Sequence, residues 1–173
     1  MKIGLIGAGR LGLCLALLMD KAGYSVIASD VRKDYIDGLQ MGEVTTTEPL
    51  VGQYLDSARR IEFTTDNLRV IEESDIIFTL VLTPSLENGS YDVSNVDDVV
   101  SDILKYGWDK DLSNKSLVIG CTTNPGDCDF FQDRLSETGI SVFYNPEFIA
   151  QGSIIKDLQN ADMVLLGGDG KHK

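Results

Sequence analysis

The sequence is poor in basic residues, in cysteine and in long apolar runs, and each shortage excludes a class of protein. Lysine and arginine number 15 against 27 acidic residues, which gives a formal net charge of −12. A surface this acidic repels phosphate backbones, so we expect no nucleic-acid partner. The charge does not exclude the binding of one phosphate compound, because backbone N–H groups can hold a phosphate without cationic side chains.

Apolar runs are too short for a membrane protein. None approaches the roughly 18 residues that a membrane helix needs, so we expect no membrane partner. The apolar segment 3–6 is followed at once by Gly7, Gly9 and Arg10. This interruption makes a secretory signal peptide a poor interpretation of the N-terminus.

Cysteine is scarce, and Cys14, Cys121 and Cys128 form an odd set without a close pair. Their spacing matches neither a disulfide framework nor a zinc site, so we expect no metal. Reduced thiols are typical of a cytoplasmic protein, which is the location we expect.

What the sequence does contain is a regular alternation of short β-branched runs and longer helical patterns. This alternation predicts one α/β domain over residues 1–173, with a doubly wound, mostly parallel sheet and helices on both faces. The expected strands are residues 2–6, 25–29, 61–64, 75–81, 116–120, 141–144 and 163–166. The expected helices are residues 11–21, 34–41, 51–58, 68–73, 94–105 and 128–137.

Three details refine this expectation. Asp66 is a credible N-cap for the helix at 68–73. The continuous apolar run 75–81 is typical of a central strand that is buried on both faces. Residues 167–173 (GGDGKHK) are short, polar and glycine-rich, and they are the only linker-like piece of the sequence.

A glycine motif lies between the first expected strand and the first expected helix. Its six residues are Gly7, Ala8, Gly9, Arg10, Leu11 and Gly12, a G-x-G-x-x-G pattern. The pattern alone is weak, since a sequence with 17 glycines in 173 residues meets it sometimes by chance. Here it joins a strand to a helix, and Asp30 closes the next strand 18 residues after Gly12, as in dinucleotide-binding Rossmann folds. This agreement disfavours a glycine-rich turn without a ligand.

Each part of the motif has a physical role. Gly7 permits the tight turn, Gly9 lets the backbone approach a pyrophosphate, and Gly12 lets the helix pack closely on the strand. Exposed N–H groups and the helix dipole then hold the diphosphate. Asp30 would accept hydrogen bonds from the adenosine ribose, and its carboxylate would repel a 2′-phosphate, so NAD is the predicted cofactor. Arg32 and the lysine after it could nevertheless approach a 2′-phosphate.

Six short segments spread along the chain give information beyond the glycine motif. They are residues 9–13 (GRLGL), 48–49 (EP), 63–66 (FTTD), 83–85 (TPS), 88–94 (NGSYDVS) and 145–153 (NPEFIAQGS). Together they resemble the N-terminal, Rossmann-type NAD-binding domain of the UDP-glucose/GDP-mannose dehydrogenase family. The last segment is the most specific, because few other Rossmann proteins place N-P-E-F, three residues and Gly-Ser directly after a late strand.

The resemblance implies an activity for the parent enzyme. Members of the family oxidise the C6 hydroxymethyl group of a nucleotide sugar to a carboxylate with two NAD, through an aldehyde and a cysteine thioester. The cysteine belongs to a glycine-rich motif in a second domain, which follows a central helix, and neither motif nor helix is found in this sequence. We therefore expect a cofactor domain, similar to that of UDP-glucose 6-dehydrogenases, that binds NAD but does not turn over. Its expected partner is a nucleotide sugar, foremost a UDP-sugar.

The resemblance also assigns cofactor residues beyond the glycine motif. Thr83 would line the cofactor site, and Thr122 would orient a water molecule near the nicotinamide. Gln151 stands where the family commonly has a glutamate. It can still form a hydrogen bond near the nicotinamide but cannot act as a base.

On the substrate side, Glu147 matches the glutamate of N-P-E-F, which is the candidate general base for thioester hydrolysis. Phe148, Ile149 and Ala150 would lie along the sugar nucleotide. From the residues alone, Glu147 and the two threonines follow expected strand ends, where open α/β sheets bind ligands. A threonine there can also simply cap a helix, and a glutamate after a proline can simply begin one.

The sequence departs from the family at several positions. Residues 121–125 read CTTNP where the family has a serine-threonine-valine-proline segment, so the proline is displaced by one position. Tyr35 stands where the family has a basic residue. Cys121 falls on the family's serine, and the only histidine, His172, lies in the tail. None of the three cysteines lies in the nucleophile's motif, so we expect none of them to be the nucleophile.

Two alternatives remain open on the residues. One is the NAD-binding domain of another dehydrogenase, of the 6-phosphogluconate or 3-hydroxyacyl-CoA type. The other is a binding-only module that senses or sequesters NAD. Since dimers in the family depend largely on a long helix beyond this segment, we expect a monomer or at most a weak dimer.

Overall fold

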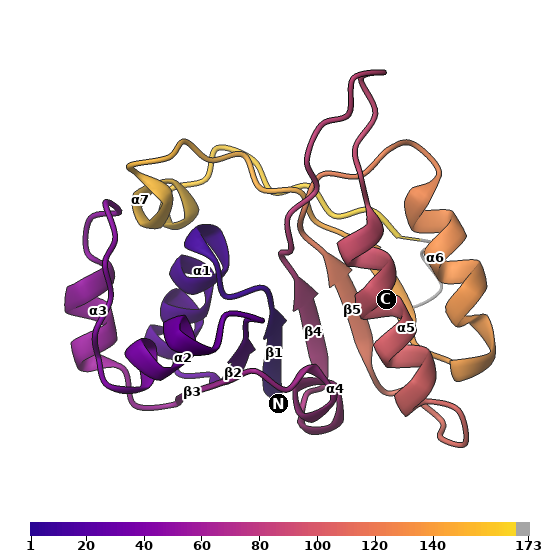
Figure 1. Ribbon diagram of the computed structural model, residues 1–173, viewed down its shortest axis with the longest axis horizontal. Coiled ribbons are helices and arrows are strands. Elements are labelled where there is room, and N and C mark those ends of the chain that lie inside the picture. Colours follow the sequence, from indigo (N-terminus) through magenta and orange to yellow (C-terminus); the bar gives the residue numbers. More distant parts are fainter. Residues whose placement is uncertain (169–173) are drawn as a thin grey trace.

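The computed structural model describes residues 1–168, and the expected tail therefore lies mostly outside the described residues, as does His172. Strands and helices follow one another along the chain in the predicted order as far as β6, and a last helix, α7, which the sequence analysis did not predict, comes after it (Figure 1). The strands are β1 (Lys2–Ile6), β2 (Ser25–Ser29), β3 (Ile61–Thr64), β4 (Ile76–Thr79), β5 (Ser116–Ile119) and β6 (Ser141–Tyr144). The helices are α1 (Arg10–Lys21), α2 (Lys33–Gln40), α3 (Val51–Ser57), α4 (Asn67–Glu73), α5 (Ser94–Tyr106), α6 (Asp127–Leu135) and α7 (Ile154–Gln159), with a short 3₁₀ turn at Ser136–Thr138.

The six strands form one parallel sheet in the order β3-β2-β1-β4-β5-β6. Strand β1 lies inside the sheet, where Ile3 pairs with Val26 of β2 on one side and with Ile76 of β4 on the other. The chain order reverses between β1 and β4, and such a switch point opens a crevice at the carboxyl ends of the strands. The predicted doubly wound, Rossmann-type sheet is confirmed.

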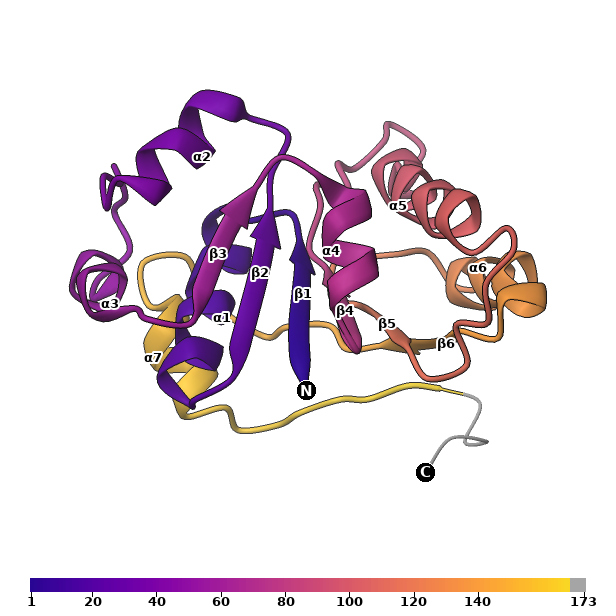
Figure 2. The same ribbon diagram turned by 90° about the horizontal axis from the view of Figure 1, so that it is seen from below.

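Two apolar clusters cover the two faces of this sheet. Helices α4, α5 and α6 bury residues such as Ile71, Ile103 and Phe131 against one face. Helices α1, α2, α3 and α7 bury residues such as Leu17 and Ile154 against the other. In Figure 2 the second group of helices gathers beside β2 and β3, and α5 and α6 lie beyond β4. Within residues 1–168 no helix combines the length and the apolar character that crossing a bilayer requires.

Helix ends follow local chemistry. Asp66 caps α4 as predicted, because its carboxylate accepts a hydrogen bond from the Arg69 N–H at 3.1 Å. The N-cap residue of helix α1 is Gly9, which has no side chain that could accept a hydrogen bond from the first turn. The first turn of α1 also contains no acidic residue, so its N–H groups and its positive dipole end are left for another partner.

Two strand predictions need correction. The segment 163–166 is not a strand, because only Gly167 pairs with β6, through an isolated antiparallel bridge to Tyr144. Its four side chains are 45–77% exposed, so its apolar residues cover no sheet face. The run 75–81 gives the shorter strand β4, in which Ile77 and Thr79 are buried while Ile76 and Phe78 are only partly buried.

The chain makes a long return crossing after β6. Residues 145–153 run from this edge strand across the carboxyl ends of the other strands, and α7 then packs beside α1 on the far half of the sheet (Figure 1). The chain comes back to β6 at Gly167, whose N–H and carbonyl groups bond to Tyr144 at 2.8 and 2.9 Å. We call residues 145–153 the crossing segment.

Candidate dinucleotide-binding site

A cleft of about 840 Å³ lies at the carboxyl ends of the strands, at the switch point between β1 and β4. The turn between β1 and α1, the ends of β2, β4 and β5, and the crossing segment line it. Its volume falls within the range of about 300–1,000 Å³ that is usual for cofactor and ligand sites. The fold therefore brings together segments that are far apart in the sequence.

The three glycines of the motif have the positions that a dinucleotide requires. Gly7 has a φ of +99°, and a Cβ there would lie 2.6 Å from the Leu80 carbonyl oxygen. A Cβ on Gly12 would overlap the Gly7 carbonyl oxygen. A Cβ on Gly9, in contrast, would meet no atom within 4 Å, because it would point into open space in the cleft. Gly7 and Gly12 are therefore needed for close packing, and Gly9 leaves room for a ligand.

Backbone donors at the start of α1 face this room. The first intrahelical bond runs from the Leu13 N–H to the Gly9 carbonyl at 2.8 Å, so the N–H groups of Arg10, Leu11 and Gly12 precede it. The N–H of the buried Ala8 instead donates to Ser29 at 2.8 Å and supports the turn. An uncapped helix start beside an open glycine fits a pyrophosphate, so the residues present fit the predicted cofactor.

Asp30, at the end of β2, lines the cleft but is already paired. Its carboxylate accepts hydrogen bonds from Arg32 through Nε and Nη2, both at 2.8 Å, and through the backbone N–H at 3.1 Å. Burial raises the pKa of Asp30, but the hydrogen bonds and the charge of Arg32 outweigh it and hold the pKa below its usual value. The guanidinium of Arg32 also lies 4.2 Å from the ring centroid of Tyr35. Asp30 is therefore ionised and held in place by Arg32.

The later predicted residues separate into two groups. Thr83, Thr122, Glu147, Ile149 and Gln151 line the cleft together with Asp30 and with Gly7, Gly9, Arg10 and Leu11 of the glycine motif. Ala8 and Gly12 of the motif are buried and do not line it.

Phe148 and Ala150 do not line the cleft. Phe148 is 59% exposed, and the Ala150 N–H donates to the Asp157 carboxylate at 3.0 Å. Their predicted contact with a sugar nucleotide stays a prediction.

Glu147 stands in a distinctive electrostatic environment. It is half-buried in the cleft wall, and burial raises the pKa of its carboxyl group. A carboxylate that is less stable than usual in its charged form accepts a proton more readily near neutral pH. The geometry thus supplies a candidate base at the predicted residue.

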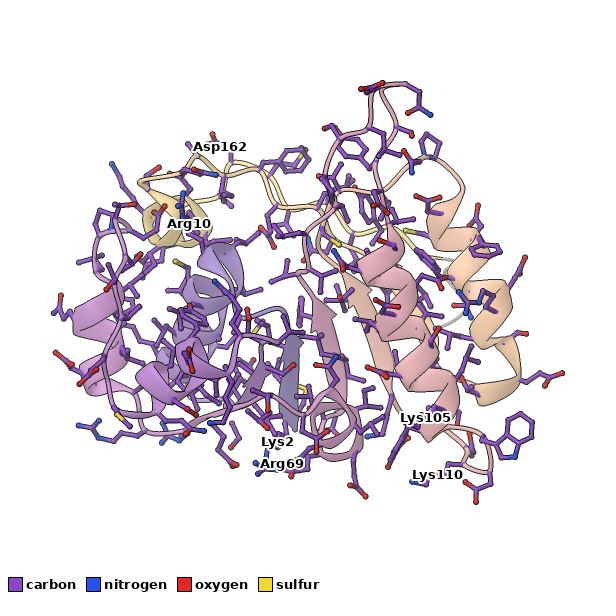
Figure 3. All side chains as sticks on the ribbon, in the orientation of Figure 1. Lys2, Arg10, Arg69, Lys105, Lys110 and Asp162 are labelled. Carbon is purple, nitrogen blue, oxygen red and sulfur yellow. The ribbon has the colours of Figure 1, made fainter. Side chains whose placement is uncertain are left out.

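Two contacts hold the crossing segment against the first half of the chain. Glu48 is only 4% exposed, and its carboxylate accepts hydrogen bonds from the N–H groups of Gly152 at 2.8 Å and Ile154 at 3.3 Å. Arg10 donates through Nη1 to the Gln151 side-chain oxygen at 2.5 Å. Figure 3 shows Arg10 between the start of α1 and α7. Glu48 was part of a motif in the sequence, but only the structure gives it this anchoring role.

Asn124 anchors the loop in which the proline is displaced. Its side chain accepts from the Tyr91 N–H at 2.8 Å and donates to the Tyr91 carbonyl at 3.0 Å. Its own N–H donates to Asp127 at 2.7 Å. These bonds join the loop after β5 to the loop after β4 and so fix the two segments that carry Thr122 and Thr83.

Sequence reasoning missed several residues that line the cleft. They include Asn67, Asn95 and Asp98, which lie at or near the starts of α4 and α5. Asn95 donates to the Leu82 carbonyl at 2.8 Å and Asn67 accepts from the Ser29 hydroxyl at 2.7 Å. The usable signal was their place at helix starts that follow strand ends, where a switch-point crevice opens.

The three thiols do not suit nucleophilic chemistry. Burial raises the pKa of Cys14 to about 12 and that of Cys121 to about 11. Burial also raises the pKa of Cys128. Thiols with such pKa values are almost entirely protonated near neutral pH, whereas the thiolate is the nucleophile. That none of them acts as the nucleophile stays a prediction.

Comparison with known proteins finds similarity to one family of enzymes, both in a sequence model and in individual relatives. The sequence model of the UDP-glucose/GDP-mannose dehydrogenase family, NAD binding domain, matches residues 1–173. The UDP-glucose 6-dehydrogenase of Rhizobium meliloti is 30% identical over 179 residues, which span 98% of this chain and 40% of that protein. The GDP-mannose 6-dehydrogenase of Pseudomonas aeruginosa is 28% identical over 181 residues, which span 96% of this chain and 41% of that protein.

A solved structure is similar as well. The crystal structure of a ternary complex of GDP-mannose dehydrogenase from Pseudomonas aeruginosa aligns with a TM-score of 0.86 and 28% identity, over 97% of this chain and 41% of that one. The chain thus spans about 40% of the length of the relatives that it matches.

Proposed function

The chain belongs to the UDP-glucose/GDP-mannose dehydrogenase family as its NAD-binding domain, and from this we propose that it is the cofactor half of a nucleotide-sugar dehydrogenase. The proposed parent reaction is the NAD-dependent oxidation of the C6 hydroxymethyl group of a UDP-sugar to a carboxylate. Family membership also decides against the 6-phosphogluconate and 3-hydroxyacyl-CoA dehydrogenase alternatives. The described residues on their own are proposed to bind NAD without turnover.

The glycine motif and Asp30 carry the binding step. The N–H groups of Arg10, Leu11 and Gly12 would donate to the pyrophosphate at the positive end of the α1 dipole. Asp30 keeps acceptor capacity beyond its three bonds to Arg32, because a carboxylate has about four lone-pair sites. The remaining site would accept a ribose hydroxyl group.

The residues Thr122, Glu147 and Gln151, in another part of the cleft lining, would lie near the nicotinamide, the reacting part of NAD. NAD supplies a hydride acceptor when it is bound. Thr122 and the Gln151 side chain line the same cleft and can orient a water molecule and the carboxamide by hydrogen bonds. Glu147 would take the proton from that water, and the burial that raises its pKa favours this role. Gln151 has no basic oxygen to share the task, so Glu147 is proposed to act alone.

The substrate and the nucleophile complete the proposal. Ile149 lines the cleft, and the exposed ring of Phe148 offers an apolar surface beside it for a sugar nucleotide. A thioester step would need a thiol from outside residues 1–168, because the three described thiols are largely protonated near neutral pH.

One observation carries the cofactor assignment: the uncapped start of α1 and the open side of Gly9 face a cleft that also contains Asp30. Calorimetric titration of the chain with NAD tests it. We expect saturable binding of one NAD, an affinity reduced about tenfold by Asp30→Ala, and loss of binding in Gly9→Val, whose side chain would fill the open space.

Controls separate this result from a folding defect. Asp129→Ala removes a carboxylate from the exposed surface of α6 and should leave the affinity unchanged. Circular dichroism would verify that every variant is folded. A folded wild-type chain that does not bind millimolar NAD, or that binds it equally well as Gly9→Val, would overturn the cofactor assignment.

A further inference from the structure

A second pocket opens beside the cofactor cleft. It has a volume of about 340 Å³, and its polar lining consists of Arg10, Arg32, Tyr35 and the threonines of residues 45–47. We call this space the arginine pocket. Arg10 and Arg32 line the arginine pocket and the cofactor cleft at once. The two spaces therefore meet at Arg10 and Arg32, and Arg32 is bonded to Asp30.

The charge of Asp30 is compensated at this meeting point. A free carboxylate at the end of β2 would repel a 2′-phosphate on the adenosine ribose, which is the usual basis for selecting NAD. Here both carboxylate oxygens are held by Arg32, through two parallel bonds of 2.8 Å. The carboxylate and the guanidinium form a neutral pair, so the repulsion is largely removed.

Arg32 also retains donors for an anion. A guanidinium has five N–H groups, and the bonds from Nε and Nη2 to Asp30 use only two of them. The side chain of Arg32 is 56% exposed, and its stacking on Tyr35 keeps the planar group in one orientation. The remaining N–H groups are therefore available in a fixed fork, the geometry that suits a phosphate.

Arg10 and the threonines complete the surroundings. Arg10 is bonded to the neutral amide of Gln151, and within residues 1–168 no acidic side chain forms an ion pair with it. The buried carboxylate of Glu48 lies close by but is bonded to the start of α7. Thr46 accepts a hydrogen bond from the Glu48 N–H and keeps its hydroxyl proton as a donor.

We propose that the arginine pocket binds the 2′-phosphate of NADP, so that this domain accepts NADP as well as NAD. Asp30 fixes where the ribose 2′-position lies, and Arg32, which is attached to Asp30, is the nearest cation to any group carried there. This inference rests on the proposed cofactor site, because it uses the same adenosine position.

Two matched pairs of ligands test the proposal by calorimetry on the 173-residue chain. NAD and NADP differ only in the 2′-phosphate, as do 5′-AMP and adenosine 2′,5′-bisphosphate. We expect NADP to bind within about tenfold of NAD, and the bisphosphate to bind more tightly than 5′-AMP. The affinity for NADP should also decrease strongly with added salt, because the contact between the 2′-phosphate and the arginine side chains is ionic.

The variants identify the residue responsible. Arg32→Ala should weaken NADP by at least about tenfold more than NAD, because it removes the cation and exposes the charge of Asp30. Arg10→Ala should weaken NADP in the same sense. Asp30→Asn should shift the preference toward NADP. Lys105→Ala is the control, since it removes an exposed cation in the last turn of α5 that lines neither the arginine pocket nor the cofactor cleft, and it should change neither affinity.

The outcomes are distinguishable. Binding of NAD with NADP at least about 100-fold weaker would overturn the inference and leave the proposed function intact. Equal weakening of both ligands by Arg32→Ala would also overturn it, because the guanidinium would then only stack on the adenine. Failure of a folded chain to bind either ligand would sink the cofactor site itself.

Discussion

Replacing Glu48 by glutamine tests whether the crossing segment is held by the contact that the structure shows. The carboxylate of Glu48 is 4% exposed and accepts two hydrogen bonds at the start of α7, from Gly152 at 2.8 Å and Ile154 at 3.3 Å. Glutamine has nearly the same shape, so it leaves no cavity. It keeps one oxygen but turns an NH₂ group toward the second N–H.

The cost follows from these bonds. A hydrogen bond to a charged group contributes about 1.5–3 kcal/mol, and a buried N–H without a partner costs about 1–3 kcal/mol. The second bond is long, so we expect a total loss of about 2 kcal/mol for the docking of α7. This loss corresponds to about a 30-fold increase in the local opening of this region.

Hydrogen exchange followed by mass spectrometry measures that opening directly. Peptides covering residues 150–159 should exchange about 30-fold faster in Glu48→Gln, while peptides from the central strands keep their protection. NAD affinity should fall as well, because Gln151 and Glu147 lie on the released segment. Glu43→Gln, an exposed position in the same loop, is the control and should change nothing. Unchanged exchange at 150–159 in Glu48→Gln would refute the anchoring role.

Other predictions address the glycine motif, the candidate base and the assembly state. Gly12→Ala should lower the melting temperature and abolish NAD binding in calorimetry, because its Cβ would overlap the Gly7 carbonyl oxygen; normal values for both would contradict the packing. Burial raises the pKa of Glu147, so its ionisation costs stability as pH rises from the unfolded pKa through the folded one. Glu147→Gln should therefore be more stable than wild type in urea unfolding at pH 7 and equal to it well below pH 4, where both side chains are neutral; no difference at pH 7 would count against this. Analytical ultracentrifugation should find a monomer or at most a weak dimer, and a tight dimer would contradict that expectation.

The sheet and the first six helices could be predicted because their signals are local, whereas the short helix α7 was not predicted. Each strand from β1 to β6 is a short β-branched or apolar run between turn residues, and each was found at its place to within about two residues. Residues 163–166 carry the same signal and form no strand. A strand needs a partner, and only the residue after this stretch, Gly167, reaches Tyr144 on the edge of the sheet.

The site was predictable where one segment defines it. The glycine motif and Asp30 needed only a strand, a turn and a helix, and the structure places them together in the cleft. The resemblance also named Glu147 and Gln151, and the structure places them in the same cleft as the glycine motif, although their roles remain predictions.

Pairings between distant residues could not be read from the sequence. Arg10 meets Gln151 across 141 positions, and no local pattern reports such a contact. Local spacing also could not tell that Arg32 folds back onto Asp30, because its side chain has many rotamers. The sequence also did not report that the side chain of Phe148 is largely exposed, because the resemblance only placed it along the sugar nucleotide.

The return crossing has a consequence for how the molecule is made. Glu48 must wait for residues 152–154, more than 100 positions later, before the cleft wall that carries Glu147 can close. Contacts of such sequence separation form late, because the chain entropy of closing the loop is lost before the contact stabilises anything. During synthesis the first half of the sheet can fold as it leaves the ribosome. The nascent chain would therefore gain a complete cofactor cleft only when α7 has emerged, later than all six strands of the sheet.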